Sequence, residues 1–201
     1  MLVNLISPSD YSVMSWKNGK GKTTELMSGK DPDDESFLWR LSIASVSENG
    51  CFSDFSGYSR ILIMLAGNGM SLIHDHDRRD ILDKKFDFCR FSGDQKTVAK
   101  LKNGPIKDFN IICQNGKYIS CTPIFISGGS EFKISCEAEH TFIYSSDKSG
   151  VYWTKSGSQR KEIPFNHLLH ASLTLGQEIS VVGEGLICVQ IKKVRSGSAP
   201  Y

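Results

Sequence analysis

Short apolar runs, separated by turn-forming residues, are the feature that most restricts how this chain can fold. In residues 37–46, Trp39 and Leu41 fall on one side of an extended backbone, and Arg40 and Ser42 fall on the other. This period of two is typical of a half-buried strand. Similar short runs recur along the chain with glycine, asparagine and serine between them, and long helical periodicity is absent. The pattern predicts an all-β protein built as a sandwich or a barrel.

The remaining runs give the positions of the other expected strands. They are residues 60–66, 70–73, 86–91, 98–102, 109–113, 118–126, 131–136, 141–144, 151–154, 168–173, 178–182 and 186–194. The Gly-Asn-Gly of residues 67–69 predicts a hairpin between the first two of them. By contrast, residues 77–80 (DRRD) indicate a polar turn.

The length of 201 residues suits one large all-β domain or two small ones. A similar order of apolar runs and turns recurs weakly at a spacing of roughly eighty residues, which favours two similar barrels.

Charge and cysteine usage exclude several classes of protein. The net charge is only +2 and the basic residues are dispersed, which argues against a nucleic-acid-binding protein. No stretch approaches the roughly 18 apolar residues of a membrane helix, and residues 1–19 lack a secretory pattern. The six cysteines form no Cys-x-x-Cys pair, so free thiols in a reducing cytoplasm are expected.

Residues 16–26 (WKNGKGKTTEL) look at first like a phosphate-binding loop. That motif needs a glycine five residues before Gly21, and Trp16 occupies this position. The motif must also open a helix, whereas Thr23 and Thr24 are β-branched and Gly29 follows soon after. The segment therefore predicts a turn at Asn18 followed by a strand.

Several blocks together resemble the HutD/Ves family. They are residues 16–26 (WKNGKGKTTEL), 39–44 with 50–55 (WRLSIA and GCFSDF), 57–60 with 65–67 (GYSR and LAG), 91–94 (FSGD) and 108–110 (DFN). The likeness runs from about residue 16 to residue 110. Ser56 stands where the family often has proline, and the basic residues that usually follow residues 108–110 are absent.

The resemblance implies a bicupin, with two small jelly-roll-like β-barrels in one chain. We expect residues 1–110 to form the first barrel and residues 111–201 the second, with an exchange of strands between them left open. The family is linked to histidine degradation, where its members are thought to bind a pathway intermediate such as formylglutamate and to restrain the pathway.

Most cupins bind a metal through a His-x-His pair and a glutamate at a fixed distance before a glycine. When that glycine is set on Gly67, the glutamate position falls on Arg60, and the histidine positions fall on Ser53 and Phe55. A guanidinium repels a dication but grips a carboxylate through two parallel hydrogen bonds. We therefore expect neither a metal nor another cofactor in the first barrel. His74 and His76 share a strand face but lie away from these positions.

Each candidate binding residue has a structural alternative. Arg60 either binds an anion or pairs with an internal carboxylate, and Arg40 and Ser42 either line a pocket or meet solvent. Trp16 and Trp39 either wall a cavity or fill the core.

Three further candidates are polar. Asn18 and Thr23 either bond a ligand or serve a turn and a strand. Asn110 shares a strand face with Asp108, so this pair could join Arg40 or Arg60 in a polar cluster.

The sequence thus favours a metal-free protein that binds a small carboxylate through these residues together with Ser53 and Phe55, with no catalytic residue assigned. One alternative is a metal-independent isomerase or hydrolase acting on an acidic small molecule, which would need a general acid or base such as Glu25, Asp108 or a distant histidine. Another is a partner-binding protein with a filled barrel. The oligomeric state, a homodimer included, is left open.

Overall fold

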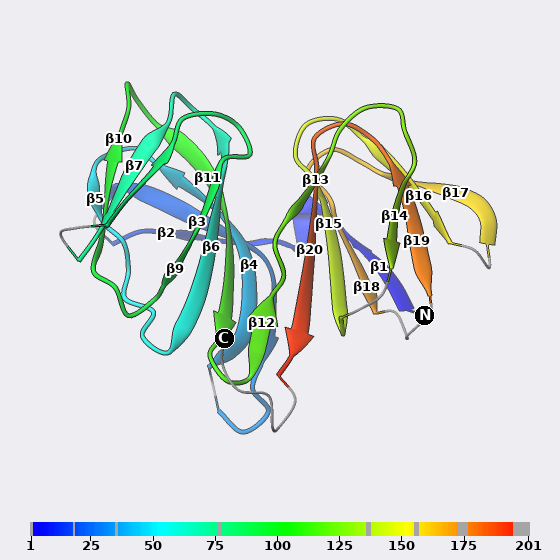
Figure 1. The fold of residues 1–201 in the computed structure, drawn as a ribbon, viewed down its shortest axis with the longest axis horizontal. Coiled ribbons are helices and arrows are strands. Elements are labelled where there is room, and N and C mark those ends of the chain that lie inside the picture. The colour runs from blue at the N-terminus through cyan, green and yellow to red at the C-terminus, as the bar shows by residue number, and fades with distance from the viewer. Residues whose placement is uncertain are drawn as a thin grey trace. The chain divides into compact units, whose positions relative to one another are not determined.

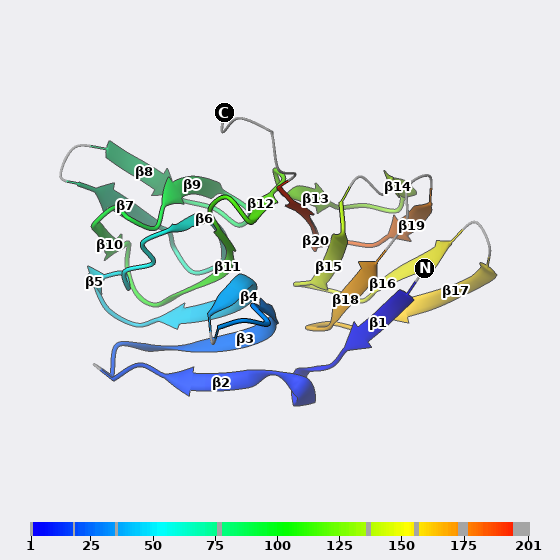
Figure 2. The same ribbon diagram turned by 90° about the horizontal axis from the view of Figure 1, so that it is seen from below.

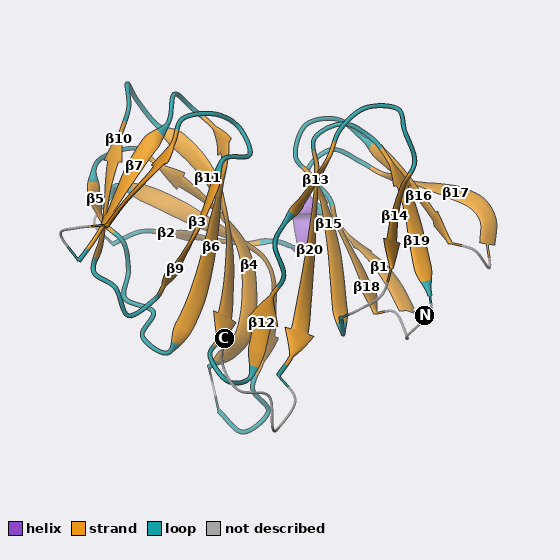
Figure 3. Cartoon of the chain, viewed as in Figure 1, coloured by secondary structure: helices purple, strands orange, loops and turns teal. Residues whose placement is uncertain are grey.

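The computed structural model describes residues 2–17, 19–34, 36–75, 78–135, 138–154, 157–172 and 177–194. Nearly all of its regular structure is β-strand, as Figures 1 and 3 show. In the described part the single helical element is the 3-10 helix η1 (Pro8–Asp10), and no helix is long and apolar enough to cross a membrane. The all-β prediction is confirmed.

The chain divides into two compact units. Residues 11–118 form the first unit, and residues 1–10 with 119–201 form the second. The boundary expected after residue 110 falls inside β11 (Ile106–Gln114). This strand is hydrogen-bonded to β4 (Phe37–Val46) on one side and to β6 (Tyr58–Ala66) on the other. A central strand paired on both sides cannot be shared out between two units.

Two antiparallel sheets make up the first unit. In spatial order, the six-stranded sheet contains β2 (Ser12–Ser15), β3 (Gly21–Lys30), β4, β11, β6 and β9 (Phe88–Ser92). The four-stranded sheet contains β5 (Gly50–Cys51), β10 (Thr97–Leu101), β7 (Met70–His74) and β8 (Arg78–Leu82). In Figure 2, β4, β11 and β6 lie on one side of this unit, and β5, β10 and β7 lie on the other.

Apolar side chains from both sheets fill part of the space between them. Leu62 and Met64 of β6 belong to one buried cluster with Met70 and Leu72 of β7. Because alternate residues of a strand share a face, Arg60 of β6 also faces this interior. The inner face of the six-stranded sheet is therefore apolar over part of its area and polar over the rest.

The expected hairpin at residues 67–69 is wrong. β6 and β7 do not pair with each other, because β6 belongs to the six-stranded sheet and β7 to the four-stranded one. Gly67 and Gly69 have φ angles of 108° and 109°, and they turn the chain from one sheet to the other. Such angles suit glycine, which has no Cβ atom to clash with the backbone.

The expected polar turn at residues 77–80 is also wrong for its described residues. Residues from Arg78 onward form the edge strand β8, which pairs with β7 in a regular antiparallel register. Arg78 and Arg79 are exposed. Because the strand is rich in charged side chains, its sequence lacks the apolar pattern from which a strand would be predicted.

The second unit repeats this two-sheet arrangement. Its larger sheet runs β1 (Leu2–Ile6), β18 (Leu168–Ser172), β15 (His140–Ser145), β20 (Leu186–Lys193) and β12 (Tyr118–Ser120), with β13 (Ile124–Ile126) also paired to β20. The smaller sheet runs β14 (Phe132–Ser135), β19 (Glu178–Val182), β16 (Gly150–Thr154) and β17 (Gly157–Ile163).

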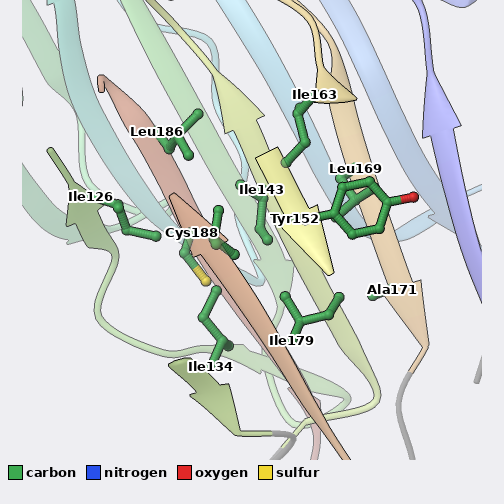
Figure 4. Close-up of a cluster of buried hydrophobic side chains, with 11 residues drawn as sticks. Ile126, Ile134, Ile143, Tyr152, Ile163, Leu169, Ala171, Ile179, Leu186 and Cys188 are labelled. Atoms are coloured by element: carbon green, nitrogen blue, oxygen red, sulfur yellow. The ribbon is translucent and has the colours of Figure 1, made fainter. Parts of the chain in front are cut away.

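Apolar side chains also meet between the two sheets of the second unit. Ile143 and Leu169 from the larger sheet belong to one buried cluster with Ile134 and Ile179 from the smaller sheet, as Figure 4 shows. β1 pairs with β18 along its full length. The N-terminal strand therefore belongs to the second unit, although the residues that follow it build the first.

Candidate functional site

A cavity of about 480 Å³ lies on the inner face of the six-stranded sheet of the first unit. Many of its lining residues are candidates from the sequence: Trp16, Thr23, Arg40, Ser42, Ser53, Phe55, Arg60 and Asn110. The structure thus brings together segments that are far apart in the chain. The size suits a small molecule rather than a peptide or a protein.

Strand register explains why the polar residues meet. Ile112 of β11 lies directly opposite Arg40 of β4 on one side and Arg60 of β6 on the other. Two residues earlier on β11, Asn110 lies opposite Ser42. Directly opposed residues share a face of the sheet, and so do residues two apart in a strand. All of these side chains therefore project into the cavity.

Arg60 is almost completely enclosed, with 6% of its surface exposed. Its Nη2 atom donates a hydrogen bond to Asn110 Oδ1 at 3.1 Å, and its Nη1 atom donates a long one to the Ser53 carbonyl at 3.5 Å. Its Nε atom has no hydrogen-bond partner among the described residues. The hydrogen-bond partners of this buried cation are therefore neutral groups.

Three aromatic rings surround the guanidinium of Arg60. Its Cζ atom lies 5.2 Å from the ring centroid of Phe52, 5.1 Å from that of Phe55 and 4.9 Å from that of Phe91. Ring faces attract a cation, and this attraction strengthens where water is excluded.

Arg40, which lies on the other side of Ile112 from Arg60, contacts one of these three rings and one further ring. Its Cζ atom lies 4.9 Å from the ring centroid of Phe55 and 4.7 Å from that of Phe37. Burial lowers the pKa of Arg40, an effect that Glu25 opposes. Phe55 therefore contacts both guanidinium groups and holds them on one wall of the cavity.

The pKa of Arg60 is lowered to about 10, chiefly because burial removes water from the cation. The negative charge of Asp108 opposes this shift, and the positive charge of Arg40 adds to it. Arg60 still carries its proton near neutral pH. Two positive groups close enough to influence each other thus face one cavity.

Asp108 is a lining residue with none of its surface exposed. Its Oδ1 atom accepts a hydrogen bond from Asn110 Nδ2, and its Oδ2 atom has no hydrogen-bond partner among the described residues. Burial raises the pKa of Asp108 to about 7, against the lowering effects of the Asn110 hydrogen bond and the Arg60 charge. Asn110 therefore links the acid to the arginine without a direct ion pair.

Trp16 and Thr23 make a wall of the cavity together. The Nε1 atom of Trp16 donates a hydrogen bond to Thr23 Oγ1 at 2.8 Å, and both residues line the cavity. The glycine-rich segment considered at first as a phosphate loop thus leads from this wall into β3.

Two of the candidate residues are not placed in the cavity. Trp39 lies on the opposite face of β4 from Arg40 and is 3% exposed. It packs so closely on Gly29 that a Cβ atom there would lie 2.5 Å from the indole nitrogen. Asn18 falls outside the described residues. Conversely, Lys17 and Phe52 line the cavity but were not among the candidates.

The described residues contain no group of three or more histidine, cysteine or acidic side chains that could hold a metal ion. His74 is completely buried, and both of its ring nitrogens are engaged. Nδ1 lies 2.9 Å from Thr97 Oγ1, and Nε2 lies 3.1 Å from Asp80 Oδ2. His74 thus joins β7 to β8 and β10, while His76 lies outside the described residues.

Comparison with known proteins decides the family. A model of the HutD family matches residues 8–189. The chain belongs to the HutD family. An uncharacterized 21.2 kDa protein in the hutC 3′ region of Pseudomonas putida is 42% identical to it over 117 residues, which is 58% of this chain and 60% of that protein. The match therefore covers less than two thirds of that relative.

Solved structures agree with this assignment. HutD from Pseudomonas fluorescens SBW25 has a TM-score of 0.81 and 28% identity, over 96% of this chain and 100% of that one. A cupin 2 conserved barrel domain protein from Leptotrichia buccalis has a TM-score of 0.52 and 12% identity, over 92% of this chain and 96% of that one. The second likeness shows the fold alone. It confirms the expected cupin-like fold, in which each unit pairs two open sheets in the manner of a jelly roll.

Proposed function

We propose that this HutD-family chain is a metal-free binding protein for a small carboxylate and modulates histidine utilisation. The observation that carries this proposal is the pair of arginines on one cavity wall. Arg40 and Arg60 flank Ile112 on a single sheet face, and both are largely withdrawn from water. A buried cation is stable only when a charge or strong acceptors compensate its lost hydration.

A carboxylate would supply that compensation. The hydrogen bonds that Arg60 donates go to an amide oxygen and a backbone carbonyl, and its Nε atom is unpaired among the described residues. A guanidinium with a free N–H edge can bind a carboxylate through two parallel hydrogen bonds. The alternative that Arg60 pairs directly with an internal acid has little support, because Asn110 stands between Arg60 and Asp108.

The link to histidine utilisation rests on the family and on its gene context. The chain is a HutD-family member, and one relative is named for its place in the hutC 3′ region. Formylglutamate is the carboxylate that the family resemblance suggests. A cytoplasmic location belongs to the same proposal, and it is supported by the five described cysteines, all of which are free thiols.

Isothermal titration calorimetry tests the proposal. We expect the protein to bind at least one of formylglutamate, urocanate, histidine and glutamate, and the Arg60→Gln variant to bind it at least about tenfold more weakly. Arg79→Gln is the matched control, because it removes the same charge from an exposed position of the same unit. An absence of heat with all four compounds and folded protein would contradict the proposal.

One observation also favours the enzyme alternative. Asp108 lies in the cavity, and its pKa of about 7 suits a general acid or base. The two functions differ in one readout. The compound that binds is incubated with a stoichiometric amount of protein and then analysed by mass spectrometry. A protein that only binds leaves the compound unchanged, whereas an enzyme converts it to a product of different mass or fragmentation.

A further inference from the structure

We propose that Asp108 reads a hydrogen-bond donor on the ligand, so that the cavity selects carboxylic acids that also carry an N–H or O–H group close to the carboxylate. This inference rests on the proposed function, because it concerns the same cavity. It adds the chemical class of the ligand and a residue that determines specificity.

Asp108 has a side-chain oxygen that lacks a hydrogen-bond partner among the described residues. The side chain is fully buried and lines the cavity, and one of its two oxygens is occupied by Asn110. The other oxygen, Oδ2, has no hydrogen-bond partner among the described residues. A buried carboxyl oxygen without a donor is unfavourable. A ligand that brings a donor to this oxygen would remove the penalty.

Asn110 lies between the side chains of Arg60 and Asp108. Its amide oxygen accepts from Arg60, and its amide nitrogen donates to Asp108. Both ends of the amide are therefore used, which fixes its orientation. Because Asn110 keeps the acid and the arginine from joining in a direct ion pair, each of them keeps a buried atom that has no hydrogen-bond partner among the described residues.

The side chains of Arg60 and Asp108 lie close together. A single side-chain amide bridges Arg60 and Asp108, so a ligand that reaches both needs its carboxylate and its donor only a few bonds apart. Acids with an acylamino or a hydroxyl group on the carbon next to the carboxylate have this arrangement. A simple dicarboxylate without such a group satisfies the arginines but leaves Asp108 Oδ2 unpaired.

Three probes separate the two contacts. N-formylglutamate carries the N–H donor, and 2-formyloxyglutarate is the ester in which an oxygen atom replaces that N–H. Glutarate carries carboxylates alone. The measurement is made by calorimetry at about pH 8, where Asp108, with its pKa of about 7, is mostly ionised. We expect the wild-type protein to bind the amide at least about tenfold more tightly than the ester, since a hydrogen bond to a charged group is among the stronger ones.

Two variants then assign the effects to residues. Asp108→Asn keeps the size of the side chain. With its oxygen held by Asn110, it presents an N–H₂ group to the ligand, so the preference for the amide should vanish or reverse. Arg60→Gln should weaken both probes by a similar factor and leave their ratio unchanged. Circular dichroism shows whether each variant is folded.

The outcomes are distinct. An equal affinity of the wild-type protein for amide and ester overturns the inference while the proposed function stands, and this result needs no variant. An unchanged amide preference in folded Asp108→Asn overturns it as well. If the wild-type protein binds none of the three probes, the inference falls together with the carboxylate function.

Discussion

Burial moves the pKa values of Arg60 and Asp108 in opposite directions, and both shifts favour the uncharged form. Desolvation disfavours a charge of either sign, so it lowers the pKa of the arginine and raises that of the aspartic acid. At neutral pH the arginine remains charged, whereas the acid is close to its midpoint. The sign of the net charge in the cavity is therefore positive, which is the condition for anion binding.

The raised pKa of Asp108 gives a prediction for how the stability of the fold depends on pH. The folded-state pKa of Asp108, about 7, lies above its ordinary value of 3.8. The folded protein therefore binds this proton more tightly than the unfolded chain, so the stabilisation is complete below pH 3.8 and is lost as pH rises through 7. We expect Asp108→Asn to lack this loss, and hence to gain stability relative to wild type as pH rises from about 4 to about 8. Urea denaturation at several pH values measures the difference.

Asp80 is the matched control for this experiment. It is a partly exposed acid of the same unit, paired with Arg78 and His74. Asp80→Asn should keep the loss of stability between about pH 4 and pH 8 that is due to Asp108. If Asp108→Asn and wild type show parallel stability curves across this range, the raised pKa of Asp108 is refuted.

A second residue-level prediction concerns Phe55, whose ring contacts the guanidiniums of both Arg40 and Arg60. Phe55→Leu keeps an apolar side chain but removes the ring face. We expect carboxylate affinity to fall by about 1 kcal/mol, because the arginines lose the surface that holds them. Calorimetry measures the affinity, with Phe88→Leu, an exposed position on β9, as the control. An unchanged affinity would show that the ring plays no part in positioning.

At the scale of elements, the alternation of apolar and polar residues predicted those strands that have one apolar face and one polar face. β4 has the bounds expected from its alternation, and Arg40 and Ser42 project into the cavity for the same reason. The same alternation places Trp39 on the other face, so its candidacy conflicted with that of Arg40. β8 was missed, because it is a polar edge strand without an apolar stripe.

Long-range pairing explains what the sequence could not predict. The switch of sheets after β6 depends on partners that come later in the chain, namely β9 and β11 for β6 and β10 for β7. The burial of Asp108 likewise depends on neighbouring strands. Its residue type and its strand face were readable from the sequence, but the loss of water that raises its pKa was not.

The sheet switch leads to a prediction for Gly67. An added Cβ would lie 2.7 Å from Ile106 Cγ2 and from the Pro105 carbonyl, at a φ angle of +108°. Gly104 has a similar φ angle of +112°, but an added Cβ there would meet nothing within 4 Å. We expect Gly104→Ala to cost about 1 kcal/mol from backbone strain alone, and Gly67→Ala to cost clearly more. Thermal denaturation measures both, and equal losses would contradict a steric role for Gly67.

At the scale of the whole molecule, the chain crosses between its two units more than once. Residues 1–10 belong to the second unit, residues 11–118 build the first, and the chain then returns to complete the second. The cavity residues all fall in the first unit. The proposed ligand site and the strand pairing of the second unit therefore lie in different parts of the chain, and they should respond to different substitutions.

Leu5→Pro tests this separation. Leu5 lies opposite Leu169 in the ladder between β1 and β18, and proline cannot donate a ladder hydrogen bond. We expect faster amide hydrogen exchange in β18 and unchanged affinity for the carboxylate ligand. Val13→Pro is the matched control, because it places proline in the edge strand β2, whose neighbours Met14 and Ser15 line the cavity. That variant should weaken binding and leave exchange in β18 as it is. If Leu5→Pro abolishes binding while Val13→Pro does not, the site depends on the N-terminal strand and the assignment of the cavity to residues 11–118 is wrong.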